Sequence, residues 1–583
     1  MFCARERISE ARRRPLSQQP LSLTVTALLL LLTSITVPTA ASSQVAGAPE
    51  REELPRFKPD DPIREDPDRV LLFPEPAERE ISKAIDLLQK TFTSPEGGSE
   101  RAANINTIGE VPDSSWFENR MSHRVMTIEE LVRGPNQGDG PDVSTPWRIV
   151  GAKTAGITPG FRIVDARGDL YFIKFDPLNW PQMATSTEVV GTKFFYAFGY
   201  HTPENYLVRW SGEYTLDRES EVLWDDGHRT LLNEAYINEL LENVPVRPDG
   251  TIQVVASKGL LGSPIGPFDF QGTRSDDPND IFPHEDRREL RAYRVFTAWM
   301  NHNDSDSVNT LDMWIDKDED SVEDGRGYVR HNLIDFGTVM GSGAWQPHAR
   351  RIGNEYYIEF TPALKSAATL GIWDRPWRKV HYDIYPSVGR FESDYFQPET
   401  WKPDYPNPAF DRMTLQDALW ATRTVMRFTD EMIRAMVACG RYDDPAAQEH
   451  VIETLIERRD KTVRYWLAQI NPVDGFEVAD APDGEHRLAF TNLGVEAGLA
   501  GECSYGYAWH TFGNGTGVYQ AIGSPGLSPR PELRIPSSDA EFIMVKLSSS
   551  CPDQPKWTSE VDVYLQNGPA PSVVGIERFD PQD

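Results

Sequence analysis

Between Trp299 and Gly337 the chain gathers carboxylate and amide side chains at spacings that suit metal and phosphate chemistry. His302, Asp304 and Asn309 follow the pattern H-x-D-x-x-x-x-N, and an apolar run leads into the triplet Asp-Phe-Gly, which Asp335 opens. Carboxylate and amide oxygens are the hard ligands that Mg2+ prefers, and a carboxylate can also accept a proton from a hydroxyl. Each motif is short enough to arise by chance, so the order of the motifs along the chain carries the argument.

Upstream of this segment, alternating apolar residues predict a hairpin that runs into a third strand, which ends near Lys174. Gly151, Gly156 and Gly160 lie between the first two strands, but their spacing departs from G-x-G-x-x-G. A plain Gly-rich hairpin explains these glycines equally well when they are taken alone. The next stretch predicts a packed helix with Glu188 near its start, either as a buried partner of the lysine or as a solvated helix-start carboxylate.

The order of these motifs resembles that of protein kinases, in which a third-strand Lys, a helix Glu, an H-x-D-x-x-x-x-N loop and D-F-G follow one another. The resemblance covers residues 147–470, and its divergent loops look closer to HipA-like, spore-coat CotH-like and secretory-pathway casein kinases than to signalling kinases. By motif position the resemblance implies a glycine loop over the nucleotide phosphates and a Lys174–Glu188 pair that holds those phosphates. It also implies that Asp304 is the base and that Asn309 and Asp335 are ligands of Mg2+ or Mn2+.

Other positions depart from that pattern. Asp306 stands where many Ser/Thr kinases keep a phosphate-facing Lys, and its carboxylate could itself serve as base or metal ligand. No alanine-proline-glutamate motif follows Gly337, and residues 338–408 are instead dense in Trp, Tyr, Arg and Pro. His331 and His348 could bind phosphate, although a His in such surroundings is more often structural. These departures argue against an ordinary Ser/Thr kinase.

Composition and the first residues indicate an exported protein. The 583 residues carry a formal net charge of −30, which disfavours nucleic acid and anionic membranes unless a local basic patch compensates. Arg12–Arg14 precede the apolar run Leu21–Val37 and then small residues, which predicts a signal peptide cleaved near Ala41 or Ser43 rather than a retained anchor. We therefore expect no membrane anchor after cleavage. We also expect a periplasmic or extracellular location, with a bacterial route favoured because Asn303 opens a glycosylation sequon inside the motif loop.

Three cysteines remain once Cys3 is lost with the signal peptide, which leaves an odd one in an exported chain. Cys503 and Cys551 both lie in the strand-rich tail and could pair, whereas Cys439 follows an apolar helix and is expected to be a buried thiol. The sequence contains neither C-x-x-C nor H-E-x-x-H, so a zinc site is not expected.

The predicted fold class is α+β, a bilobal protein-kinase-like fold with a C-terminal β-sandwich-like domain. The expected segments are a signal peptide at 1–43, a linker and helical extension at 44–140, an N-lobe at 141–212, a helical C-lobe with insertions at 213–471, and the β domain at 472–583. The expected helices are 75–88, 231–241, 287–300, 414–438 and 446–470, and further strands are expected at 204–209 and 251–259, with a hinge at 210–214.

These features together predict an exported kinase-like phosphotransferase that uses ATP or another nucleotide with Mg2+ or Mn2+. The acceptor would be a hydroxyl of a protein or of a small molecule, and phosphoryl and nucleotidyl transfer are not separated by the sequence. The alternative, from the class of binding proteins and not of enzymes, is a pseudokinase or surface-binding protein whose β domain recognises the ligand. A carbohydrate-active enzyme is the third, and it would need paired carboxylates.

Overall fold

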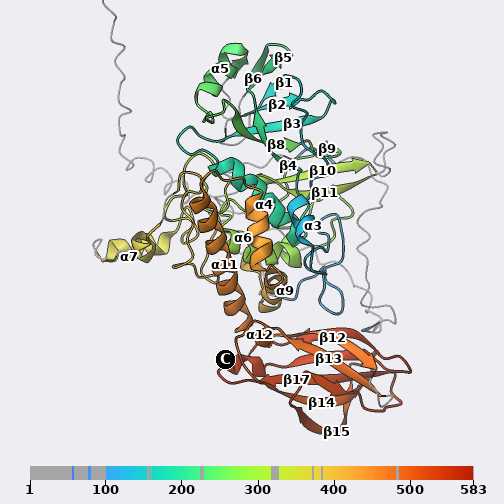
Figure 1. The fold of residues 1–583 in the computed structure, drawn as a ribbon. Coiled ribbons are helices and arrows are strands. Elements are labelled where there is room, and N and C mark those ends of the chain that lie inside the picture. Colours follow the sequence, from blue (N-terminus) through green and yellow to red (C-terminus); the bar gives the residue numbers. More distant parts are fainter. Residues whose placement is uncertain are drawn as a thin grey trace, which may run out of the picture. The chain divides into compact units, whose positions relative to one another are not determined.

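The computed structural model describes residues 56–57, 76–79, 100–153, 158, 160–223, 229–316, 327–369, 373, 375–382, 385–480 and 485–581. Within these ranges the chain is a mixed α+β protein with five sheets (Figure 1). The predicted signal peptide lies outside the described residues. Of the predicted helix at 75–88 only residues 76–79 are described, and they are not helical. Among the helices of the described ranges, none has the length and apolar character needed to cross a membrane.

The first sheet has six strands in the order β4-β8-β3-β2-β1-β5. Its strands are β1 Trp147–Ala152, β2 Gly160–Val164, β3 Leu170–Phe175, β4 Asn205–Trp210, β5 Tyr214–Leu216 and β8 Ile252–Lys258. All neighbours are antiparallel except β1 and β5, which are parallel. Alternate residues such as Ile149, Ile163 and Ile173 are fully buried in one core, as the period of two in their strands predicts. The predicted hairpin and third strand are confirmed.

The sheet extends past residue 212, where we expected the N-lobe to end. β5 pairs with β1 in the segment expected to follow a hinge, and β8 lies between β3 and β4. The intervening insertion contains the hairpin of β6 Ser220–Leu223 with β7 Arg229–Leu232, and the helix α5 Glu234–Glu242. The sequence predicted α5 and β8 but neither β5 nor the hairpin of β6 and β7, and the predicted helix at 231–241 began inside β7. Only pairing between distant segments assigns β8 to this sheet.

The helices below this sheet share one large apolar core. They are α3 Ile128–Arg133, α4 Met183–Phe198, α6 Arg288–Met300, α8 Pro408–Asp411, α9 Leu415–Met426, α10 Asp430–Ala438 and α11 Pro445–Leu467, while α7 Phe360–Ala368 belongs to the segment after the Asp-Phe-Gly triplet. The single helix predicted at 414–438 is wrong. Thr429 begins a new helix there, because its side chain accepts a hydrogen bond from the backbone of Met432.

A small antiparallel sheet joins β9 Ser263–Pro264, β10 Thr310–Asp316 and β11 Gly327–Leu333. The hairpin of β10 and β11 connects the H-x-D-x-x-x-x-N loop to the Asp-Phe-Gly triplet. Its register pairs Thr310 with Leu333, so the residues just outside both strands lie at the same end of the hairpin.

The C-terminal strands form two antiparallel sheets around one apolar core. The smaller sheet holds β12 Val473–Asp480, β13 His486–Asn492 and β16 Glu532–Arg534, and the larger holds β14 Ser504–Phe512, β15 Tyr519–Ser528, β17 Phe542–Ser550, β18 Val561–Gln566 and β19 Ser572–Arg578. The short helix α12 Leu493–Glu496 follows β13. The expected pair Cys503 and Cys551 forms a disulfide, and Cys439 is a partly buried thiol.

Candidate functional site

Lys174 lies at the point where three distant segments meet. It is the penultimate residue of β3, and its neighbour Ile173 points into the apolar core, so the Lys174 side chain lies on the opposite face of the sheet. Its Nζ donates hydrogen bonds to Glu188 Oε2 at 2.9 Å and to Asp335 Oδ1 at 3.0 Å. The lysine side chain is 12% exposed. Three residues predicted separately from the sequence are thus in direct contact.

Glu188 is held by the buried helix α4. Asp176, two residues after Lys174, ties the start of this helix to the sheet, because its Oδ1 accepts hydrogen bonds from the backbone of Ala184 and Thr185. Glu188 itself is 2% exposed, which rules out a solvated carboxylate. Its Oε1 accepts hydrogen bonds from Asn205 Nδ2 and from the backbone of Phe336, each at 3.2 Å. The carboxylate is therefore satisfied on both oxygens.

The register of β10 and β11 brings Asn309 and Asp335 together. The Ile334 backbone N–H donates to the Asn309 carbonyl at 2.9 Å, which places the next residue, Asp335, at the end of the motif loop. Asp335 has φ of 60°, a left-handed conformation that Asp tolerates better than most residues. Such conformations gather at functional sites, where the surrounding structure holds them. Here the turn directs the carboxylate at Lys174.

The loop from His302 to Asn309 is braced by its own polar groups. The Asn309 amide nitrogen donates to the Asp304 carbonyl at 2.6 Å, which leaves the amide oxygen Oδ1 pointing away from that carbonyl. Asp306 is buried, and its Oδ1 accepts from the Val308 backbone as the cap of a single 3-10 turn, Ser307–Asn309. The structure thus gives Asp306 a capping contact, and its assignment as metal ligand or base remains a prediction.

Aromatic packing joins the three segments beneath these polar groups. Phe336 stacks on Phe195 of α4, with ring centroids 4.9 Å apart, and His302 contacts both rings. Burial lowers the pKa of His302 to about 4, against the opposing effect of Asp304 and Asp335. The imidazole is therefore neutral at pH 7 and serves to position the loop that follows it.

The charges at Lys174 are strongly coupled. Burial alone would lower the pKa of the Lys174 ammonium, but Asp335 and Glu188 outweigh it and raise that pKa. Burial raises the pKa of Glu188, although Lys174 acts against the shift. For Asp335 burial is outweighed by Lys174 and then by Lys153, so its pKa is lowered. Asp335 is consequently an anion that pairs directly with Lys174.

Two of the three glycines predicted to approach phosphates lie in neighbouring strands of the first sheet. Gly151 lies within β1, where a Cβ would fall 2.4 Å from Arg162 Nη2. Gly160 begins β2 directly opposite Lys174, and a Cβ there would lie 2.0 Å from the Ile173 carbonyl oxygen. Gly156 lies outside the described residues. Lys153, also in this stretch, is the residue that sequence reasoning missed, and a lysine among glycines was the available signal.

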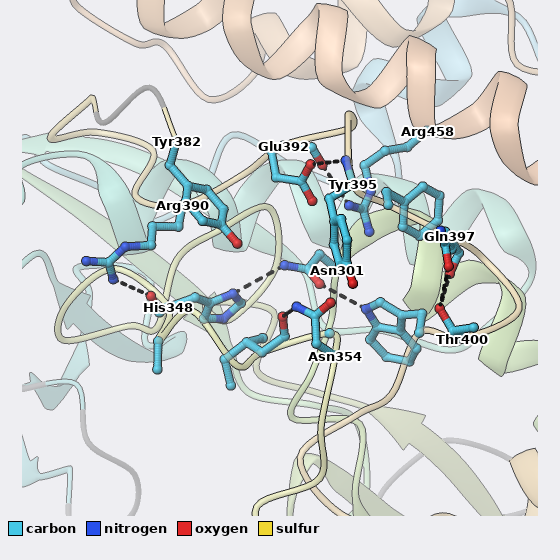
Figure 2. A pocket seen from close by; sticks show the side chains of 15 residues that line it. Asn301, His348, Asn354, Tyr382, Arg390, Glu392, Tyr395, Gln397, Thr400 and Arg458 are labelled. Atoms are coloured by element: carbon cyan, nitrogen blue, oxygen red, sulfur yellow. Dashed lines mark hydrogen bonds between the residues drawn. The ribbon is translucent and has the colours of Figure 1, made fainter. Parts of the chain in front are cut away.

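His348 lines a polar pocket of about 440 Å³, its open mouth included, beside the start of the motif loop (Figure 2). Trp401 Nε1 donates to Asn301 Oδ1 at 2.9 Å, which turns the Asn301 amide nitrogen toward His348 Nδ1, 3.4 Å away. Burial, followed by the nearby His302, lowers the pKa of His348 to about 3. A neutral His348 adds no positive charge for a phosphate, which favours a structural role.

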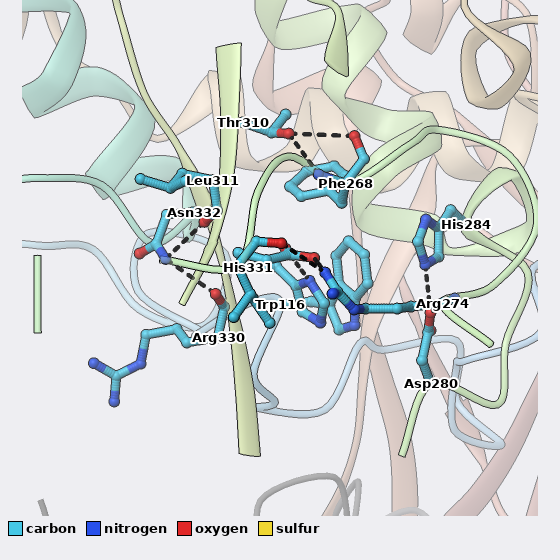
Figure 3. Close-up of polar contacts among 12 residues, drawn as sticks. Trp116, Phe268, Arg274, Asp280, His284, Thr310, Leu311, Arg330, His331 and Asn332 are labelled. Atoms are coloured by element: carbon cyan, nitrogen blue, oxygen red, sulfur yellow. Dashed lines mark hydrogen bonds and ion pairs between the residues drawn. The ribbon is translucent and has the colours of Figure 1, made fainter. Parts of the chain in front are cut away.

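His331 belongs to a buried network, drawn in Figure 3. Its ring stacks on Trp116 with centroids 3.5 Å apart, and its Nδ1 lies 2.7 Å from Asp312 Oδ1. Arg274 occupies the other oxygen of that carboxylate at 3.2 Å. Stacking and pairing account for His331 as a structural residue.

The donor set near Asp335 fits Mg2+ better than a transition metal. Across the described residues no group of three or more His, Cys, Asp or Glu side chains could hold a metal ion. Asp335 and Asn309 instead offer one carboxylate and one amide oxygen. Mg2+ is commonly bound by one or two carboxylates, with water and substrate phosphates completing the octahedron. The residues present therefore suit a metal that arrives with a nucleotide.

Comparison with known proteins yields no match: no family model, no curated protein and no solved structure aligns significantly with the chain.

Proposed function

We propose that this chain is an exported kinase-like phosphotransferase, with a bilobal catalytic region and a β-sandwich-like C-terminal domain. One observation carries the proposal: the Lys174 ammonium lies between Glu188 and Asp335, at 2.9 and 3.0 Å. In the kinase resemblance these are the residues that hold the nucleotide phosphates and the metal. Burying a lysine with two carboxylates costs desolvation, so retaining the complete set favours a functional role over a structural one.

Each residue of the site has a role in this proposal. Lys174 binds the phosphates, and Glu188 holds the lysine in position through its own contacts with Asn205 and the Phe336 backbone. Asp335 and Asn309 hold Mg2+ or Mn2+, which supplies charge neutralisation of the phosphates when bound. Asp304 accepts the proton of the acceptor hydroxyl, and catalysis then rests mainly on positioning and charge. The acceptor is a protein or a small molecule.

The test is a thermal melt of the purified exported protein with Mg-ATP and with Mn-ATP. Wild type is compared with Asp335→Asn and with Asp169→Asn, a matched control at the residue before β3 whose carboxylate pairs with Lys258. We expect a metal-dependent rise of a few degrees in wild type and in the control, and none in Asp335→Asn. No rise with any nucleotide or metal would sink the proposal.

Turnover separates the proposal from its main rival. Following the label from γ-labelled and α-labelled ATP distinguishes phosphoryl from nucleotidyl transfer. Binding of nucleotide without transfer of either label to an extract of acceptors, or to water, would favour a pseudokinase.

A further inference from the structure

Lys153, Gly160 and Lys174 form one cross-strand row on the first sheet. The Lys153 backbone N–H donates to the Gly160 carbonyl at 3.2 Å, one step beyond the β1–β2 pair of Ala152 with Phe161. Gly160 is in turn the direct partner of Lys174 in β3. Residues directly opposite one another on antiparallel strands point to the same face of a sheet. Both lysines therefore lie on one face, with a residue that has no side chain between them.

The Lys153 side chain extends over Gly160. Its Cδ lies 3.2 Å from the place that a Cβ of Gly160 would occupy, and its Nζ donates to the Thr158 carbonyl at 3.1 Å. β1 and β3 are separated by two strand spacings, which is about 10 Å. Gly160 therefore leaves the space between the two lysine side chains free of a side chain of its own.

We propose that Lys153 is a second phosphate-binding residue, which together with Lys174 holds the polyphosphate chain of a nucleoside di- or triphosphate over Gly160. This inference rests on the proposed function. Two cations on opposite sides of the glycine suit a chain of several phosphates, since a single phosphate at Lys174 would not extend to Lys153. The site would thus select nucleotides by the length of their phosphate chain.

Calorimetric titration with ATP, ADP and AMP in Mg2+ tests this assignment. Lys153→Met and Lys153→Gln remove the charge, Lys153→Arg keeps it, and Lys258→Met is the control, a lysine of β8 that pairs with Asp169. We expect loss of the charge to weaken ATP binding by about 10- to 100-fold, as for one charge-assisted hydrogen bond, with AMP nearly unaffected. Lys153→Arg should retain most of the ATP affinity, and Lys258→Met should bind like wild type.

The outcomes separate the two proposals. Equal losses for all three nucleotides, or no loss for ATP, would overturn the role of Lys153 while leaving the proposed function standing. A wild-type protein that binds none of the three would instead overturn the proposed function. Melting temperatures without nucleotide show whether a variant has lost only its contact with the Thr158 carbonyl. Loss of that contact alone would lower the stability of the fold without changing the ratio of the affinities for ATP and AMP.

Discussion

Lys174 shows how strongly a single position depends on its partners. The Lys174 ammonium forms ion pairs with both Glu188, whose side chain is 2% exposed, and Asp335, whose side chain is 28% exposed. Pairs of this kind contribute little net stability relative to an apolar replacement, yet removing one partner leaves buried charge uncompensated. The stability of the fold is therefore sensitive to substitutions that remove only one of the charged partners.

We expect Lys174→Met to destabilise the fold by about 3 kcal/mol, because two carboxylates would then face each other without their cation. Urea unfolding followed by fluorescence measures the change. The double variant Lys174→Met with Glu188→Gln should recover part of the loss. Equal stability of wild type and the single variant would show that the ion pairs do not constrain the fold.

Ionisation of the single residue Asp176 makes the stability of the fold depend on pH. Burial raises the pKa of Asp176 to about 6, against the hydrogen bonds from Thr185 and other donors, whereas the ordinary value is 3.8. A carboxyl whose folded pKa is raised stabilises the protein fully below its unfolded pKa, and this contribution is lost as pH rises through the folded value. The window is therefore pH 4 to 6.

We expect Asp176→Asn to flatten the fall in stability between pH 4 and 6, since an amide does not ionise. The contribution of Asp176 over this window is about 3 kcal/mol from a shift of about two pKa units. Denaturant titrations at pH 4, 5, 6 and 7 measure it. Parallel pH profiles for the two proteins would contradict the assignment.

At the scale of elements, short polar contacts decide where helices begin. The apolar spacing from Leu415 to Ile433 suits one continuous helix, yet the chain ends α9 at Met426 and starts α10 at Asp430. Thr429 accepts a hydrogen bond from the Met432 backbone N–H, and Phe428, in the link between the two helices, is buried against aromatic rings of α4 and α6. A cap and a buried aromatic ring thus override a continuous periodicity.

We expect Thr429→Ala to cost about 1 kcal/mol through loss of this cap, and Thr429→Ser to cost much less because its hydroxyl can accept the same hydrogen bond. Chemical denaturation compares the two variants. A loss in Thr429→Ser as large as that in Thr429→Ala would point to packing of the methyl group instead of capping.

At the scale of the whole described chain, Arg423 links the helical core to the C-terminal sheets. Its guanidinium pairs with Glu110 at 2.6 Å and with Asp474 of β12 at 2.9 Å, and Arg578 also pairs with Asp474 at 2.7 Å. Nearby, Trp557 Nε1 donates to the carbonyl of Leu467, the last residue of α11. Burial lowers the pKa of Arg423, but Glu110 and Asp474 outweigh it and keep the residue charged.

We expect Arg423→Met to lower the free energy of unfolding by about 2 kcal/mol, a value that is discounted because Glu110 is partly exposed. We also expect the C-terminal sheets to melt separately from the helical core in this variant. Scanning calorimetry resolves one transition from two. Arg434→Met, at an exposed pair with Glu449, is the control and should leave the single transition in place. One unchanged transition in Arg423→Met would show that other contacts couple the two parts.

The sequence by itself determined those features that depend on neighbours along the chain. Alternation predicted the strand that carries Lys174 and the β domain at 472–583, and helical spacing predicted the helix that carries Glu188, because side-chain period follows directly from local backbone geometry. The order of the motif residues is likewise a property of the linear chain and could be read directly from the sequence.

Only the tertiary structure decided which of these elements meet. The contact of Lys174 with Glu188 and Asp335 joins residues 14 and 161 positions apart, and no local pattern specifies such a distance. The place of β8 inside the first sheet and the alignment of Lys153 with Lys174 across Gly160 depend likewise on strand register. Register is set by the burial of one face of the whole sheet, which is a property of the folded chain and not of any one segment.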